Sequence, residues 1–181
     1  MRGVAFYLVI GGSAIVLTTG CAPNRPKAQF SQTIVPESRI AAKDEAKVKV
    51  EAGAGVHITE SEKAELAEII DMYITDRKIT NSREGEKKTY DVNILLTRYE
   101  NASAVARVLM GGLGQIHIDG EVTLLEMPER KPLGKFTISK TCAWGDTYGG
   151  IARMRDIELT FADGVAAALT GEQEEQKKKA K

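Results

Sequence analysis

The sequence predicts an α+β fold: a two-layer sandwich in which an antiparallel sheet of about four strands carries two helices on one face. Four segments, at 47–51, 90–99, 115–127 and 133–142, alternate apolar and polar residues as half-buried strands do. Two others, beginning near Thr59 and at Ile151, repeat apolar residues every three or four positions. Because each amphipathic helix needs an apolar surface, both helices should cover the same face of the sheet.

The strands divide into a dry face and a wet face. In the 115–127 strand one face carries Ile116, Ile118, Val122 and Leu124, and the other carries Gln115, His117, Asp119, Glu121 and Thr123. This division is typical of an antiparallel sheet covered on one side. The first strand, 47–51, should turn Val48 and Val50 inward. In the last strand Phe136, Ile138 and Cys142 share a face that Lys140 interrupts, which predicts Cys142 as a small buried residue.

Both helices have recognisable apolar stripes. Thr59 and Glu62 have the spacing of a capping box, in which each side chain bonds an amide at the start of the helix. The first stripe is then Leu66, Ile69, Ile70 and Tyr73, and the charged stretch 76–88 should form a turn region. The second helix, 151–169, has the stripe Ile151, Met154, Ile157 or Glu158, Phe161, Val165 and Leu169.

The N-terminus has the plan of a secretory signal. Arg2 precedes an apolar run from Val4 to Leu17, and small residues follow directly before Cys21. The run is shorter than the roughly 20 residues that span a bilayer. We therefore expect residues 1–20 to be a signal peptide, 21–46 a lipid anchor and flexible tether, 47–170 the globular domain, and 171–181 a disordered charged tail.

The junction Leu17-Thr18-Thr19-Gly20-Cys21 resembles the lipobox of bacterial lipoproteins, although Thr18 stands where that family usually has leucine. The resemblance implies that Cys21 carries diacylglycerol, begins the mature chain and is acylated on its amine. Two or more acyl chains hold a protein stably at a membrane. Ala22 stands where lipoproteins kept in the inner membrane commonly carry Asp, which favours the periplasmic face of the outer membrane. A plain secreted protein with a stray cysteine is the alternative.

A second resemblance covers the domain itself. A Tyr-Asp-Val strand at Tyr90, a glycine-rich apolar loop, two further strands, a Gly-Gly loop at Gly149 and an alanine-rich helix follow one another. Residues 90–169 thus resemble an uncharacterised lipoprotein family, the domain of unknown function 4410. This resemblance implies no known activity and no catalytic residues.

Composition and motifs argue against several classes of function. The 25 basic and 25 acidic side chains balance, whereas a nucleic-acid binder normally has a basic excess. His117 with Asp119 and Glu121 is a weak metal pattern, because one histidine and two carboxylates also form an ordinary solvated face. Gly111 to Gly114 lacks the Gly-Lys-Ser/Thr ending of a phosphate loop. We expect no nucleic acid, metal or cofactor.

Two connections between the predicted elements carry the candidate interaction residues. The first, a possible interaction loop, contains Val108, Leu109, Met110 and Leu113, apolar residues where polar ones are usual; the alternative is that this segment packs as core. The second contains Trp144 and Tyr148, which could contact a ligand. The sequence therefore favours a non-enzymatic, lipid-anchored interaction or assembly module of the bacterial envelope, with an envelope protein as partner. The alternative is a periplasmic ligand-binding or hydrolytic protein that uses the loops near Trp144.

Overall fold

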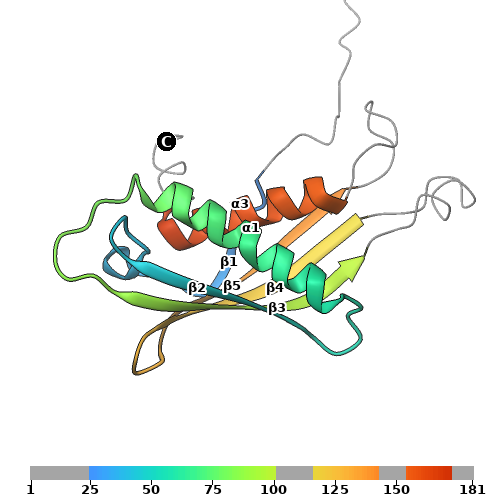
Figure 1. The fold of residues 1–181 in the computed structure, drawn as a ribbon, viewed down its shortest axis with the longest axis horizontal. Coiled ribbons are helices and arrows are strands. Elements are labelled where there is room, and N and C mark those ends of the chain that lie inside the picture. Colours follow the sequence, from blue (N-terminus) through green and yellow to red (C-terminus); the bar gives the residue numbers. More distant parts are fainter. Residues whose placement is uncertain (1–24, 101–115, 143–153, 173–181) are drawn as a thin grey trace, which may run out of the picture.

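The architecture is a single sheet with two helices on one face (Figure 1). The computed structural model describes residues 25–100, 116–142 and 154–172. The strands are β1 (Gln29–Gln32), β2 (Glu45–Ala52), β3 (Thr89–Glu100), β4 (Ile116–Glu126) and β5 (Lys131–Cys142). The helices are the short 3-10 helix η1 (Pro36–Ser38) and the long α1 (Glu60–Lys78) and α3 (Met154–Thr170). The predicted α+β sandwich is confirmed.

The sheet differs from the prediction in strand number and in direction. It is five-stranded, in the order β1-β5-β4-β3-β2, where about four strands were expected. It is also mixed and not wholly antiparallel, because β2 pairs parallel with β3 from Glu45↔Thr89 to Ala52↔Leu96. The physical reason is the intervening helix: α1 carries the chain back along the sheet, so β3 starts at the same end as β2.

The unexpected strand, β1, lies inside the predicted tether of residues 21–46, and that boundary is wrong. β1 pairs antiparallel with β5, placing Phe30 opposite Phe136 with ring centroids 5.1 Å apart. Beyond β1, Ile34 and Ile40 are 2% and 0% exposed. These residues stabilise the domain by removing apolar surface from water. The folded domain therefore includes the described residues before Glu45.

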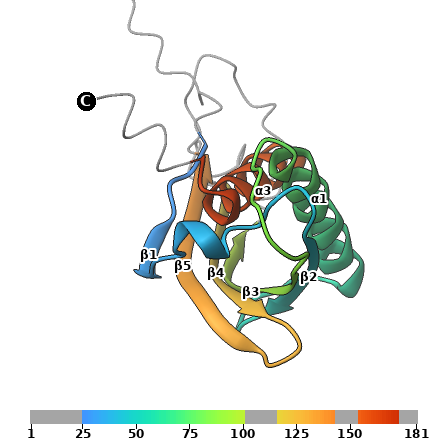
Figure 2. The same ribbon diagram turned by 90° about the vertical axis from the view of Figure 1, so that its left-hand side faces the viewer.

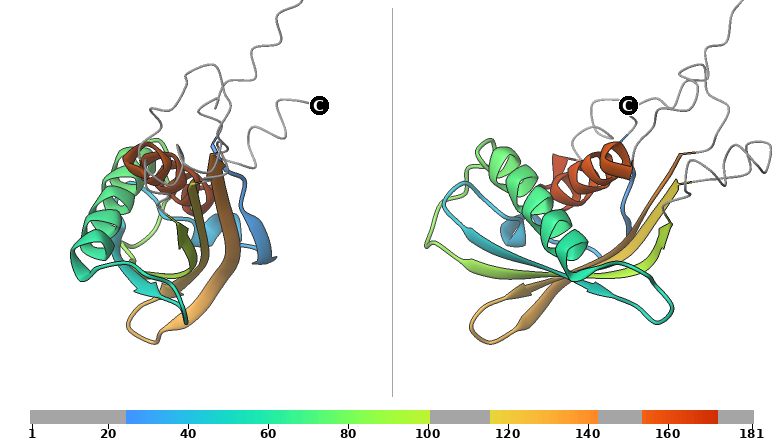
Figure 3. Two further views of the ribbon diagram at one scale, coloured as in Figure 1. Left: turned by 90° about the vertical axis from the view of Figure 1, so that its right-hand side faces the viewer. Right: turned by 45° about the vertical axis from the view of Figure 1, so that its right-hand side comes forward.

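Both long helices pack on the sheet's dry face, as Figures 2 and 3 show from three sides. In α1 the capping box between Thr59 and Glu62 is confirmed, and the predicted stripe holds, with Leu66, Ile69 and Ile70 buried and Tyr73 half-buried. The helix continues past the predicted turn at Asp76 to Lys78. In α3 both candidates for one stripe position, Ile157 and Glu158, are buried. No helix in the described ranges is long and apolar enough to cross a bilayer.

The core lies between the helices and the inward face of β3, β4 and β5. The predicted dry-face residues of β4, Ile116, Ile118, Val122 and Leu124, are all 2% exposed or less. Gly120 shares this face, and a Cβ there would lie 3.1 Å from Cζ of Phe161, so the glycine lets α3 approach closely. Cys142 ends β5, but its side chain lies outside the described residues, and its predicted burial stays a prediction.

Candidate functional site

The two candidate connections attach at one end of the sheet. The loop with Val108, Leu109, Met110 and Leu113 joins β3 to β4, and the loop with Trp144 and Tyr148 follows β5. The loops themselves lie outside the described residues, as does Cys21. Their attachment points are neighbours, however, because Glu100 pairs with His117 and Ile116 pairs with Cys142. We call this part of the sheet, marked by Glu100, Ile116 and Cys142, the loop end.

At the loop end, polar residues of β3, β4 and β5 lie opposite one another and form rows across the outer face of the sheet. The cross-strand register aligns Glu100 with His117 and Thr141, and Arg98 with Asp119 and Ser139. Within these rows Arg98 donates to Glu100 (Nη2–Oε2, 2.8 Å), and Asp119 accepts a hydrogen bond from Ser139. The bond from Arg98 holds the pKa of the Glu100 carboxyl below its usual value. These two adjacent rows of hydrogen-bonding groups therefore lie next to the points where both candidate loops leave the sheet.

His117 was expected on a wet face, and the structure modifies that expectation. Its register position is on the outer face, yet its residue is only 8% exposed. Nδ1 lies 2.7 Å from Oγ1 of Thr141 on the neighbouring strand. Across the described ranges no three His, Cys, Asp or Glu side chains lie close enough together to hold a metal ion. His117 therefore takes part in a hydrogen bond between β4 and β5.

A β-bulge at Thr97 turns Tyr99 toward the helices. Leu96 pairs with Gly120 and Arg98 with Asp119, so Thr97 has no opposite residue and the alternation shifts by one. Tyr99 consequently points inward and donates a hydrogen bond to Glu158 of α3 (Oη–Oε1, 2.7 Å). Burial, and then the bond to Glu158, raise the pKa of the Tyr99 hydroxyl. The bond gives the buried Glu158 carboxylate a partner and ties α3 to the loop end.

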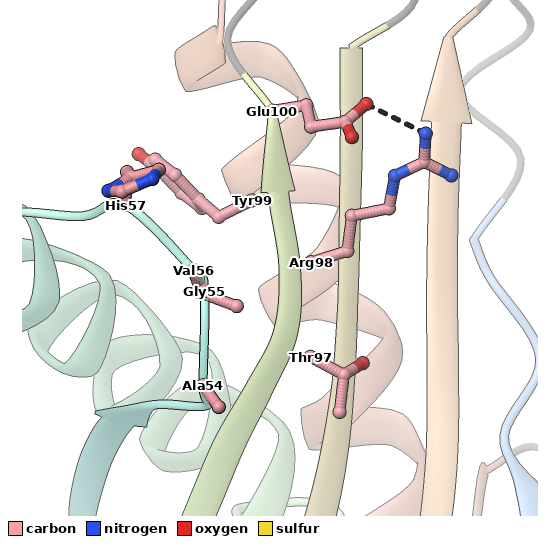
Figure 4. A pocket seen from close by; sticks show the side chains of 8 residues that line it. All are labelled: Ala54, Gly55, Val56, His57, Thr97, Arg98, Tyr99 and Glu100. Carbon is pink, nitrogen blue, oxygen red and sulfur yellow. Dashed lines mark hydrogen bonds and ion pairs between the residues drawn. The ribbon is translucent and has the colours of Figure 1, made fainter.

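A small pocket opens beside the bulge (Figure 4). Its volume is ≈ 250 Å³, and its lining consists of Ala54, Gly55, Val56, His57, Thr97, Arg98, Tyr99 and Glu100. The rings of His57 and Tyr99 lie together on one side of β3, whereas Arg98 and Glu100 point to the other side and pair with each other. The side chains therefore do not converge on one point. The pocket offers hydrogen-bonding and charged groups to a polar partner.

The opposite end of the sheet holds a buried charge cluster that sequence reasoning missed. Asp44, 1% exposed, accepts hydrogen bonds from Arg83 (Nη2–Oδ1, 2.7 Å), from the amide of Ala41 (2.9 Å) and from the amide of Lys88 (3.0 Å). Burial, and then the charge of Asp44, raise the pKa of Tyr90 to about 12. We call this region, containing Asp44, Arg83 and Tyr90, the closed end. The Asp44 carboxylate joins its own segment to the connection between α1 and β3, and so fixes the chain where β2 and β3 begin.

Comparison with known families gives a match within this fold. Residues 62–145 match the model of a domain of unknown function, DUF4410, which confirms the predicted family resemblance. The matched stretch differs from the expected 90–169: it begins within α1 and ends after β5, and α3 lies beyond it. A search of curated proteins found no match.

Several solved structures are similar to the chain. The PelC dodecamer from Paraburkholderia phytofirmans is 9% identical, with a TM-score of 0.53 over 80% of this chain and 97% of that chain. Protein XCC0632 from Xanthomonas campestris is 16% identical, with a TM-score of 0.48 over 80% and 95%. A minor lipoprotein from Acinetobacter baumannii is 14% identical, with a TM-score of 0.41 over 74% and 95%. The similarity to PelC shows a shared fold.

Proposed function

Starting from the match of residues 62–145 to DUF4410, we propose that this chain is a lipid-anchored protein of the bacterial cell envelope whose domain is a non-enzymatic interaction and assembly module. The lipid on Cys21 binds it to a membrane, on the periplasmic face of the outer membrane. Its other partner is an envelope protein or a further copy of this chain.

The observation that carries this proposal is the arrangement of the loop end. The register brings the attachment points of both candidate loops together, because Glu100 is opposite His117 and Ile116 is opposite Cys142. Apolar residues of one loop and Trp144 and Tyr148 of the other are thereby tethered to neighbouring strands, beside exposed charged groups. Apolar centres with a polar surround are the usual composition of protein interfaces.

The anchor and the fold comparison support two further parts of the proposal. The apolar run before Cys21 is shorter than a membrane span and ends in small residues, which favours lipidation at that cysteine. PelC, whose fold this domain shares, is a dodecamer. We therefore propose that the assembly includes self-association of the domain through its loop end.

Aspartate substitutions at Val108, Leu109 and Met110, one at a time, test the interface. We expect at least one of them to leave the melting temperature nearly unchanged while abolishing self-association or co-purification with an envelope protein, measured by light scattering and by cross-linking in cells. Met72→Asp is the matched control, because Met72 is an exposed apolar residue (55%) on α1. Large losses of stability at all three loop positions would identify the loop as core and remove the interface.

The lipid is tested separately by metabolic labelling with a palmitate analogue. The wild-type chain should be labelled and the Cys21→Ser variant should not, because the thiol is the acceptor. Equal labelling of the two chains would contradict the anchor and leave the interface experiment unaffected.

A second function, ligand binding or hydrolysis by the loops near Trp144, is favoured by the pocket that His57 and Tyr99 line at the same end. Trp144 is the sole tryptophan, so its fluorescence reports on its own surroundings. Under the interaction proposal, titration with envelope oligosaccharides should leave this fluorescence unchanged. A saturable change that Tyr148→Ala abolishes would favour the ligand-binding function.

A further inference from the structure

β2 is an edge strand, and its outer side carries main-chain groups that no described residue bonds. Two hydrogen bonds fix which residues face β3: the amide of Glu45 donates to the carbonyl of Lys88 (2.9 Å), and the amide of Gly53 donates to the carbonyl of Leu96 (2.8 Å). Main-chain groups turn alternately to the two sides of a strand. The residues that direct N–H and C=O away from β3 are therefore Ala46, Val48, Val50 and Ala52. Among the described residues, no strand or loop bonds them on that side.

The two edges of the sheet differ in their capacity to pair with another strand. β1 has four residues, and its register with β5 shifts between Phe30 and Gln32. β2 has eight residues, which pair with β3 without interruption from Glu45 to Ala52. Short and bulged edge strands discourage further pairing, whereas a long, regular edge is a template for it. β2 is therefore the edge that can accept another strand.

The second half of β2 is complementary to itself in the antiparallel direction. Its sequence from Val48 to Ala52 is Val-Lys-Val-Glu-Ala. With Val50 opposite Val50 of a second copy, Lys49 lies opposite that copy's Glu51, and Val48 lies opposite its Ala52. The apolar pairs then share the helix side of the sheet, where Val50 is buried. The side chains of Lys49 and Glu51 are 67% and 58% exposed on the other side, so each can reach its counterpart.

The charges also select this register and this occupant. Side chains must keep to their own face of the sheet, so the next register in either direction places Lys49 opposite Lys49 or Glu51 opposite Glu51. Like charges directly opposite each other are destabilising. Lysines on an edge strand also discourage pairing with unrelated strands. A second copy of β2 in the register centred on Val50 satisfies both Lys49 and Glu51.

The neighbouring helix presents small residues at this edge. The bond from Lys49, and then the charges of Lys49 and Lys63, hold the pKa of the Glu51 carboxyl below its usual value, which places Lys63 of α1 beside β2. Ala67 lies one turn further along the same side of α1, and Ala64 is next to Lys63 in the sequence. The distance between two packed helices depends on the side chains at their contact. Alanines here let the α1 helices of two copies approach closely.

We propose that two copies of this chain join edge to edge through antiparallel pairing of β2 about a two-fold axis at Val50, so that their two sheets become one continuous sheet. Such an interface uses the same patch on both copies. It contains no loop-end residue, so the inference does not rest on association through the loop end.

A charge exchange tests the proposed register. The parent chain is residues 21–181 with Cys21→Ser, which keeps every described element and carries no lipid, and sedimentation equilibrium gives the dissociation constant of its dimer. Lys49→Glu and Glu51→Lys each place like charges opposite one another at two symmetry-related positions. Each should weaken the dimer about tenfold, from about threefold per pair. The combined variant Lys49→Glu/Glu51→Lys restores opposite charges and should dimerise nearly as well as the parent.

Lys47→Glu is the matched control for this exchange. It makes the same change of charge on the same face of β2, but in the proposed register Lys47 lies opposite Gly53, so the dimer should weaken little. A monomeric parent chain, a combined variant weaker than either single variant, or an equal loss in Lys47→Glu would overturn the proposal.

Disulfide formation between chains checks the same register independently. Residues 49 and 51 of the two copies would form pairs without main-chain hydrogen bonds, whose Cα atoms lie about 4.5 Å apart, within the range of a disulfide. A mixture of Lys49→Cys and Glu51→Cys chains should therefore cross-link under mild oxidation. Neither chain alone should do so to the same extent, and neither should a mixture of Lys47→Cys and Glu51→Cys chains. Equal cross-linking in all of these samples would contradict the register.

The outcome is separable from that of the loop-end experiment. Val108, Leu109 and Met110 lie outside the β2 interface, so a loop variant that loses association through the loop end should still form the β2 cross-link. Loss of the β2 pairing would leave the loop-end proposal standing, and failure of the loop-end proposal would leave the β2 pairing standing.

Discussion

The two ends of the sheet use charge in opposite ways. At the closed end, Asp44 is 1% exposed and accepts hydrogen bonds from Arg83 and from the amides of Ala41 and Lys88. At the loop end, Arg98 and Glu100 also form an ion pair, yet their side chains are 44% and 50% exposed. Breaking a buried pair leaves an uncompensated charge, whereas an exposed pair contributes little to stability. The closed end therefore specifies the fold, and the charges of the loop end remain accessible to a partner.

Asp44→Asn should have the largest effect, because it breaks the closed end. The Arg83 guanidinium, whose side chain is 17% exposed, would lose its counter-charge, and one of the amides of Ala41 and Lys88 would face a side-chain NH₂ group. We expect a loss of about 3–5 kcal/mol in the free energy of unfolding, measured by urea denaturation. Glu45→Gln is the neighbouring control, since Glu45 pairs with Lys87 on the surface and its removal should leave the midpoint unchanged. Similar urea midpoints for Asp44→Asn and Glu45→Gln would show that the buried charge contributes no more to stability than the exposed one.

The closed end was not predictable from the sequence, and the reason is the distance along the chain. Asp44 and Arg83 are 39 residues apart, one in the expected tether and the other in the expected turn region. Neither segment has an apolar period that marks it as structured. β1 is four residues long, too short to show alternation. The capping box at Thr59 was predictable because both of its partners lie within one helical turn.

Tyr99→Phe tests how firmly the loop end is tied to α3. The Glu158 carboxylate is 8% exposed and would lose its hydrogen bond from the Tyr99 hydroxyl. Hydrogen bonds to charged groups contribute about 1.5–3 kcal/mol, and we expect a loss of that size in thermal or urea unfolding. Tyr73→Phe, at a half-buried position on α1, is the matched control. An unchanged unfolding free energy for Tyr99→Phe would mean that the hydrogen bond from Tyr99 to Glu158 contributes nothing to stability.

Gly134→Ala tests the segment between β1 and β2 by overpacking it. A Cβ on Gly134 would lie 2.2 Å from Cγ1 of Ile34, far inside van der Waals contact. Extra volume in a packed core costs about 1–3 kcal/mol, which should appear as an earlier urea midpoint. Pairing the substitution with Ile34→Ala, which removes the clashing Cγ1, should make the combined loss smaller than the sum of the two single losses. An unchanged urea midpoint for Gly134→Ala would mean that the residues near Ile34 do not pack on β5. It would then favour the original prediction that residues 21–46 form a tether.

The loop-end site was predictable in part. The strand boundaries of β3, β4 and β5 were expected from their alternation, and their register then places both candidate loops together. The bulge at Thr97 and the inward turn of Tyr99 were not expected, because the shift of the apolar pattern from Leu96 to Tyr99 is a single step at the end of the strand. The parallel pairing of β2 was also missed, since alternation gives the same pattern in either strand direction.

Thr59→Ala should have the smallest effect, at the start of α1 beside the loop end. Oγ1 of Thr59 accepts a hydrogen bond from the amide of Glu62 (3.2 Å) and donates to Oε2 of Glu62 (2.7 Å). Losing an N-cap of this kind costs about 1 kcal/mol. Urea denaturation near neutral pH should show this loss, and Ser61→Ala, at a neighbouring position in the first turn, should show less.

The pH dependence of this loss separates the two hydrogen bonds of the Thr59 hydroxyl, one to the Glu62 amide and one to the Glu62 carboxylate. Hydrogen bonds from the amide and then the side chain of Thr59 hold the pKa of Glu62 below its usual 4.5. A carboxylate with a lowered pKa contributes stability that is complete above the unfolded-state pKa and disappears as pH falls through the folded-state pKa. The difference between wild type and Thr59→Ala should therefore narrow below about pH 4.5, because the bond to the carboxylate is lost and the bond to the amide persists. A constant difference down to the acid transition would assign the whole effect to the Glu62 amide.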